Sequence, residues 1–124
     1  MSIRPLVLEL IELVKQAKFL EAIEKFYAPE ATMRENLDAP RVGLPALLEY
    51  ESNVLKNVPD IRLERLESVL VDGDRAAIHW VFAFTDPKGV RHQLDEVSYQ
   101  EWQDGKIVRE RFFYDPAQRT REAS

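Results

Sequence analysis

The sequence contains no cysteine, and this absence excludes several kinds of functional site. Disulfide bonds, thiolate nucleophiles and cysteine-bound zinc or iron–sulfur centres all require that residue. The two histidines, His79 and His92, follow neither a His-x-His nor a His-Glu-x-x-His pattern, so we expect no metal site. Glycine is scarce as well, and neither a glycine-rich phosphate loop nor a serine nucleophile elbow is present. Any chemistry is therefore expected to be proton transfer without a cofactor.

Long apolar runs and basic stripes are also missing. Glu9, Glu12 and Lys15 interrupt the N-terminal apolar segment, which stays far below the roughly 20 apolar residues of a membrane-spanning helix. The same segment lacks the basic start and the small-residue cleavage site of a signal peptide. A net charge of -5, with lysine and arginine scattered among acids, disfavours contact with a polyphosphate. We therefore expect a cytoplasmic protein that binds neither nucleic acid nor membranes.

The first half of the chain has the periodicity of helices. Apolar residues recur at helical spacing from Ile3 to Lys15, from Phe19 to Tyr27 and from Leu44 to Leu55. Pro29 is predicted to stop the second of these helices. Between the second and third helices, alternating residues predict a short strand over Ala31–Glu35.

Beyond Ile61 the sequence becomes rich in β-forming residues, punctuated by turn signals. These signals are Asp72-Gly73, Pro87-Lys88-Gly89 and Asp104-Gly105, which predict three hairpins. Helices that precede such a meander indicate an α+β fold, with three N-terminal helices packed on a strongly curved antiparallel sheet. We predict one domain over residues 1–116 and a polar C-terminal tail over residues 117–124. The predicted long strands cover residues 61–71, 75–85, 90–103 and 106–114.

The two faces of the predicted strand 75–85 differ in bulk. Its large apolar residues are expected to meet the helices, and they are Ile78, Trp80, Phe82 and Phe84. The opposite face is smaller but still largely apolar, which makes it poorly suited to water and predicts a homodimer through this outer face. His79 lies on that outer face and is expected at the dimer interface or in a structural role. His92, near the turn after Gly89, is expected to be exposed.

Two short segments carry a resemblance to a known family. The order of elements, together with Phe26-Tyr27-Ala28-Pro29-Glu30-Ala31-Thr32 and Asp104-Gly105-Lys106-Ile107-Val108, resembles the nuclear transport factor 2-like superfamily, and most closely its SnoaL-like branch. The resemblance covers nearly the whole chain. It implies a cone-shaped, cystatin-like roll around a deep pocket. It leaves the function open, because the superfamily includes ketosteroid isomerases, polyketide cyclases, epoxide hydrolases, dehydratases and non-catalytic binding or assembly domains.

Glu35 is the first candidate for a catalytic residue. Strand alternation places its carboxylate beside Ala31 and Met33, on the side expected to face the pocket, where it could act as a general base. In the resemblance, Glu35 takes the place of the proton-abstracting aspartate of ketosteroid isomerases. The alternative is a structural ion pair with an arginine such as Arg34, Arg41 or Arg111.

The resemblance implies two further acids. A second acid is expected between Leu94 and Ser98, where we prefer Glu96 as the inward residue, although it could equally be an outward charge on a solvated strand. On the last strand the spacing leaves Phe112 where the cyclases carry an acid, so Asp115 is the neighbouring substitute. Asp115 could instead simply end the strand before Pro116. Steroid isomerisation is not expected, because the N-terminal helix contains no tyrosine.

Aromatic residues could form the wall of the pocket or belong to the ordinary core, and Tyr114 could also donate a hydrogen bond to a ligand carbonyl. The sequence therefore favours a cofactor-independent isomerase or cyclase that moves protons on a small apolar carbonyl compound. The alternative is a non-catalytic small-molecule-binding or dimerisation domain. The predicted substrate-binding residues are Tyr50, Trp80, Phe82, Trp102, Phe112 and Tyr114.

Overall fold

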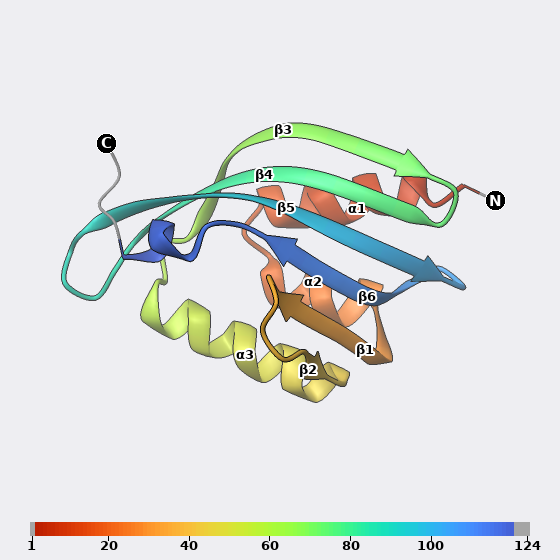
Figure 1. Ribbon diagram of the computed structural model, residues 1–124, viewed down its shortest axis with the longest axis horizontal. Helices are drawn as coiled ribbons and strands as arrows, with labels where there is room; N and C mark the ends of the chain where they lie inside the picture. Colours follow the sequence, from red (N-terminus) through yellow and green to blue (C-terminus); the bar gives the residue numbers. More distant parts are fainter. Residues whose placement is uncertain (1, 121–124) are drawn as a thin grey trace.

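A computed structural model describes residues 2–120, in which three helices cover one face of a curved six-stranded sheet (Figure 1). The α+β class and the helical layer are therefore as predicted from the sequence. The helices are α1 (Arg4–Lys15), α2 (Phe19–Phe26) and α3 (Leu44–Asn57). The strands are β1 (Tyr27–Glu35), β2 (Arg41–Val42), β3 (Arg62–Asp72), β4 (Arg75–Thr85), β5 (Arg91–Gln103) and β6 (Lys106–Phe113), and a 3-10 helix, η1 (Pro116–Arg119), follows them.

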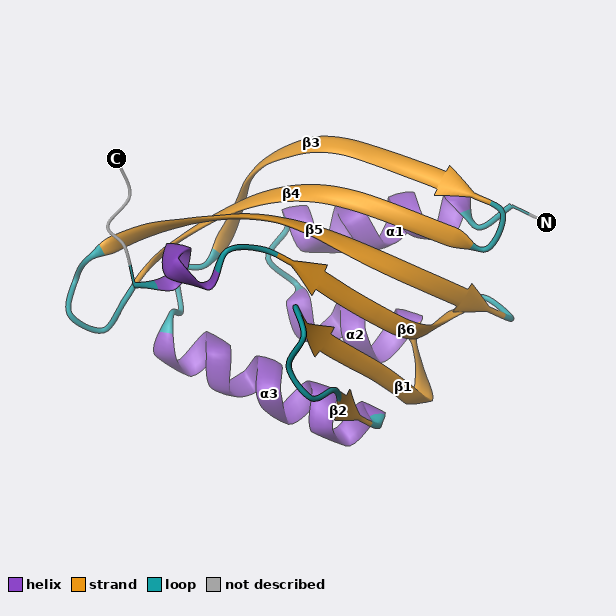
Figure 2. Cartoon of the chain, viewed as in Figure 1, coloured by secondary structure: helices purple, strands orange, loops and turns teal. Residues whose placement is uncertain are grey.

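The sheet is mixed, which corrects the expectation of a purely antiparallel sheet. Its strand order is β2-β1-β6-β5-β4-β3, and the β3 to β6 meander is antiparallel throughout. Strand β1, however, pairs with β6 in parallel. A parallel pair needs a long crossover connection, and the path from β1 through α3 and the first three strands of the meander supplies it. Figure 2 shows β1 beside β6, with their arrowheads on the same side.

The boundary between α2 and β1 also differs from the prediction. Helix α2 ends at Phe26 and β1 begins at Tyr27, so Pro29 lies inside a strand and does not stop the helix. The β1–β6 register shifts between Tyr27 and Thr32. A proline has no N–H to donate to a ladder, and an irregular stretch of strand accommodates that loss.

The turn between β5 and β6 follows directly from its two residues. Asp104 has a φ of 53° and Gly105 a φ of 78°, both in the left-handed region. A two-residue connection with both φ values positive matches the twist of an antiparallel hairpin, and Asp-Gly is one of its preferred sequences. This local chemistry fixes the β5–β6 pairing.

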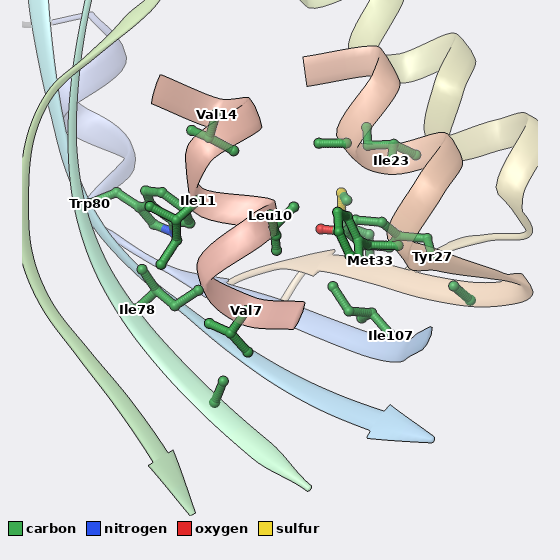
Figure 3. Packing of buried hydrophobic residues seen from close by; sticks show 14 of the residues in the cluster. Val7, Leu10, Ile11, Val14, Ile23, Tyr27, Met33, Ile78, Trp80 and Ile107 are labelled. Carbon is green, nitrogen blue, oxygen red and sulfur yellow. The ribbon is translucent and has the colours of Figure 1, made fainter. Parts of the chain in front are cut away.

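The core lies between α1 and the bulky face of β4, as the alternation in β4 predicts. Ile11 of α1 lies beside Ile78 and Trp80 of β4, whereas Leu10 lies on the side of α1 that faces Ile23 and Met33 (Figure 3). The side chains of Val7 and Ile78 are completely buried. No helix among the described residues is long and apolar enough to cross a membrane.

The prediction that His92 is exposed was wrong. Its exposed fraction is 2%, its ring stacks on Phe84 with centroids 5.0 Å apart, and its Nε2 lies 2.8 Å from Oδ2 of Asp86. His92 is buried because it lies in phase with Leu94 on the inner face of β5.

Part of the segment predicted as a tail is helical and attached to the sheet. The 3-10 helix η1 docks on β5, where the Asp95 backbone N–H donates to Oε1 of Gln118 at 2.9 Å. Residues 121–124 of that segment lie outside the described residues, and the domain boundary at residue 116 stays a prediction.

Candidate functional site

A cavity opens between the helices and the inner face of the sheet, with about 830 Å³ of empty space that includes its open mouth. Apolar side chains from α1, α2, β4 and β5 line one part of it. The other part is strongly polar, because four glutamates from four different elements reach it. These are Glu35 of β1, Glu51 of α3, Glu96 of β5 and Glu110 of β6.

Glu35 lies at the end of β1 on the cavity side, in phase with the buried Ala31 and Met33. Its Oε2 accepts a hydrogen bond from Nη2 of Arg41 at 2.7 Å, and its Oε1 accepts one from the Tyr114 hydroxyl at 2.9 Å. Arg41 was one of the three arginines considered as its partner. The two donors satisfy a charged carboxylate and hold it in a fixed orientation.

Glu96 faces the same cavity from the middle of β5. Its exposed fraction is 7%, and it makes no hydrogen bond or ion pair with any residue that the structure describes. Burial, followed by the nearby charges of Glu35 and Glu110, raises the pKa of this carboxyl to about 8. At neutral pH Glu96 is therefore mainly a protonated acid that can donate a hydrogen bond into the cavity.

Glu110 is a buried acid that the sequence analysis did not select. The Tyr27 hydroxyl donates to one of its oxygens, and Nε2 of Gln100 donates to the other at 2.7 Å. Burial raises the pKa of Glu110 to about 7, although these two hydrogen bonds act in the opposite direction. One signal was available, because Glu110 shares a face of its strand with Phe112, which was predicted to form the pocket wall.

Glu51 was missed as well, although the helical pattern contains a clue to its position. It lies four residues after the fully buried Leu47 and three before Val54, and therefore on the inward stripe of α3. Burial raises the pKa of its carboxyl, and the charge of Glu35 raises it further, whereas Arg41 and Arg119 lower it. An acid on an otherwise apolar stripe is a signal that sequence reasoning could have used.

The structure brings most of the predicted site residues together. Tyr50, Trp80, Phe82 and Phe112 line the cavity, and Tyr114 reaches it through its hydrogen bond to Glu35. The Tyr50 ring also lies under the guanidinium of Arg41, with Cζ of Arg41 3.6 Å from the ring centroid.

Trp102 and Asp115 lie away from the cavity lining. Trp102 is buried against Phe26, with ring centroids 6.1 Å apart, and its Nε1 donates to Oε1 of Gln100 at 3.0 Å. It continues the inner face of β5 toward the end of the strand, where α2 fills the space. Asp115 is exposed, and its Oδ1 accepts from the Ala117 backbone N–H at 2.9 Å, which caps η1.

This arrangement places a charged carboxylate and a mainly protonated carboxylic acid on one cavity, a combination suited to general base and general acid roles. Among the described residues, no group of three or more histidines and acids could hold a metal ion. A carboxylate and a carboxylic acid on the same cavity can exchange protons with a molecule that lies between them.

The curved sheet with three covering helices is a fold shared with an NTF2-like protein from Burkholderia pseudomallei. The chain belongs to the SnoaL-like domain family, whose sequence pattern matches residues 7–110. A comparison with curated proteins found no significant match.

Several solved structures are similar to this chain. A candidate SnoaL-like polyketide cyclase from Mesorhizobium loti is 28% identical, with a TM-score of 0.79 over 92% of this chain and 100% of its own. TerC, crystallised with polyporic acid, is 22% identical, with a TM-score of 0.74 over 89% of this chain and 92% of its own. AclR, a candidate hydroxylase from Streptomyces galilaeus, is 22% identical, with a TM-score of 0.77 over 94% of this chain and 90% of its own. The last two likenesses concern the fold.

Proposed function

We propose that this protein is a cofactor-independent isomerase or cyclase that transfers protons on a small apolar carbonyl compound held in the cavity. The observation that carries the proposal is the carboxyl of Glu96, which is buried, faces the cavity and has no partner among the described residues. A protonated acid in such a place can donate to a ligand carbonyl at neutral pH. The charged carboxylate of Glu35 on the same cavity supplies the complementary base.

In the proposed reaction, Glu35 removes a proton from the carbon next to the carbonyl. Glu96 donates its proton to the carbonyl oxygen, so that the product of this step is a neutral enol. In an isomerisation, Glu35 returns the proton to a different carbon while Glu96 recovers its own from the enol oxygen. In a cyclisation, the enol carbon instead forms a bond to a second carbonyl carbon of the same molecule. Glu96 recovers its proton from the enol oxygen, and the oxygen of the second carbonyl takes up the proton held by Glu35.

Two similar proteins support a small-molecule role. The protein from Mesorhizobium loti is described as a polyketide cyclase candidate, and TerC was crystallised with polyporic acid, a small molecule. The cavity in this chain has an apolar lining, which includes Trp80, Phe82 and Leu94, and such a lining suits an apolar small molecule.

Proton exchange provides a direct test. Small cyclic ketones are incubated with the protein in D2O, and deuterium uptake next to the carbonyl is followed by NMR. We expect the wild type to accelerate exchange, and Glu35→Gln and Glu96→Gln each to lower the rate by about 10²-fold or more. Glu49→Gln is the matched control, because Glu49 is exposed on α3 and does not line the cavity. Equal exchange rates in wild type and both cavity variants would contradict the mechanism.

The second candidate function is a binding domain without catalysis, and the openness of the cavity is compatible with it. Native mass spectrometry of freshly purified protein separates the two. A retained small molecule whose protons do not exchange faster than in buffer favours the binding domain.

We also propose that the protein forms a homodimer through the outer face of the sheet. Leu70, Tyr99 and Phe113 are exposed there, with exposed fractions of 66%, 37% and 43%. The strand register aligns Leu70 with Ala77 and Tyr99, and it aligns His79 with Val97 and Phe113, so these residues form two adjacent rows. An apolar patch of this kind on an open sheet face is typical of an interface.

A cytoplasmic location stays a proposal, with cell fractionation as its test.

A further inference from the structure

Arg119 brings a positive charge to the mouth of the cavity from outside the sheet. It is the last residue of η1, it lines the cavity, and its guanidinium lies over the Tyr114 ring, 5.3 Å from the centroid. Tyr50 lines the same cavity. The docking of η1 on β5 through Gln118 holds Arg119 there, since Nε2 of Gln118 donates to the Asp95 carbonyl at 3.1 Å.

The two arginines of the cavity differ in what neutralises them. Arg41 forms an ion pair with Glu35 at 2.7 Å. Arg119, in contrast, lies over the aromatic ring of Tyr114, and no carboxylate of residues 2–120 forms an ion pair with it. A guanidinium that lines a cavity without an ionic partner has donors left for an anionic group of a ligand.

We infer that the ligand of this cavity is an apolar molecule bearing one anionic oxygen group, a carboxylate or an acidic enol, which Arg119 and Tyr50 hold at the mouth while the apolar body lies against Trp80 and Phe82. The inference rests on the proposed function in that it names the ligand class of the same cavity. It requires binding, however, and not turnover.

The acids around the cavity do not prevent anion binding. Besides Arg119, the titratable groups that face this space are Tyr27, Glu35, Arg41, Tyr50, Glu51, Glu96 and Glu110. Glu35 is paired with Arg41, and burial raises the pKa of Glu51, Glu96 and Glu110, so these three acids hold protons more tightly than they would in water. The positive charge of Arg119 lowers the pKa of Glu51 and of Glu96, in the opposite direction to burial, so its charge acts on both groups. An anion bound beside Arg119 would offset that influence, and we therefore expect ligand binding to be accompanied by proton uptake.

The test compares 2-naphthoate with its neutral analogue 2-naphthamide by isothermal titration calorimetry. We expect wild type to bind the carboxylate at least tenfold more tightly than the amide. Arg119→Ala and Arg119→Gln should each weaken 2-naphthoate binding about tenfold or more, because glutamine keeps donors but not the charge. Neither variant should change binding of the amide. Arg65→Ala is the control, since it removes one exposed cation of β3 that does not line the cavity. Titrations in buffers of different ionisation enthalpy should show net proton uptake on 2-naphthoate binding.

Three results would overturn the inference: an amide that binds as tightly as the carboxylate, an Arg119→Ala variant that keeps wild-type affinity for 2-naphthoate, or protons released on binding. Failure of 2-naphthoate to bind at millimolar concentration would overturn it too. These outcomes are independent of the exchange assay. A preference for the carboxylate that depends on Arg119 stands even if no ketone exchanges, and ketone exchange that depends on Glu96 stands even if Arg119 proves irrelevant.

Discussion

Replacing Glu96 by glutamine tests the electrostatics of the cavity without any knowledge of the ligand. Glutamine has nearly the shape of a protonated glutamate but cannot ionise. Because the pKa of Glu96 in the folded protein lies above its ordinary value of 4.5, the folded protein keeps a proton that the unfolded chain releases. The stabilisation from Glu96 is therefore fully present below about pH 4.5 and is lost as the pH rises toward 8.

The size of this effect follows from the two pKa values. The difference between about 8 and 4.5, at about 1.36 kcal/mol for each pKa unit, gives an upper limit of about 5 kcal/mol in the free energy of unfolding. Water entering the open cavity reduces that limit, so we expect about 2 to 5 kcal/mol. At pH 5, where the carboxyl is already partly ionised in the unfolded chain, wild type and Glu96→Gln should differ by less than about 1 kcal/mol. At pH 8.5 the variant should be more stable than wild type by about 2 to 5 kcal/mol.

Urea unfolding at half-unit intervals between pH 5 and pH 8.5 measures the difference. Burial raises the pKa of Glu110 to about 7 in the wild type, and because Glu110 is present in both proteins, much of its contribution cancels when the two curves are subtracted. Glu49→Gln, on the exposed face of α3, should give a curve parallel to that of wild type. Carbon-13 NMR of the glutamate carboxyls should show a macroscopic titration near pH 8 that disappears in Glu96→Gln. Parallel curves for wild type and Glu96→Gln would refute the argument, because Glu96 would then be as well solvated as in the unfolded chain.

Two further predictions concern the core and the outer face of the sheet. Ile78→Ala removes a completely buried side chain packed against α1, and it should lower the free energy of unfolding by about 2 to 5 kcal/mol in urea titrations. Leu37→Ala, at an exposed position, is the control and should change this free energy by less than about 0.5 kcal/mol. Sedimentation velocity should show a dimer for wild type and for Leu37→Glu but a monomer for Leu70→Glu and Phe113→Glu, and a monomeric wild type at all concentrations would speak against the proposed interface.

Sequence patterns that span only a few residues predicted those strands and turns whose structure depends on neighbouring residues. The strand predicted over residues 75–85 is β4 (Arg75–Thr85), because clear turns bound it and its pairing with β5 runs without a register shift. The same alternation placed Glu35 and Glu96 on the inner face, since both strands keep a period of two from their neighbours to these residues. The positive φ values of Asp104 and Gly105 likewise follow from the Asp-Gly pair itself.

Where the periodicity breaks, the sequence was a weaker guide. In β6 the buried residues Ile107 and Glu110 are three apart, because the register with β5 shifts between Glu101 and Trp102. Such an irregularity changes which side chains face inward, and nothing in the local residue types announces it. The same limit applies to Pro29, which has the form of a helix stop signal but lies in an irregular part of β1.

By itself, the sequence determined the α+β class, the hairpins and the inward orientation of Glu35 and Glu96, because turn chemistry and side-chain alternation act over a few residues. The tertiary structure decided that β1 would pair in parallel with β6 and that Glu51, Glu110, Arg41 and Arg119 would meet Glu35 and Glu96 around one cavity. It also decided which carboxyls hold a proton at neutral pH. The physical reason is that burial and electrostatic coupling depend on groups far apart in the chain, and these groups acquire their distances when the chain folds.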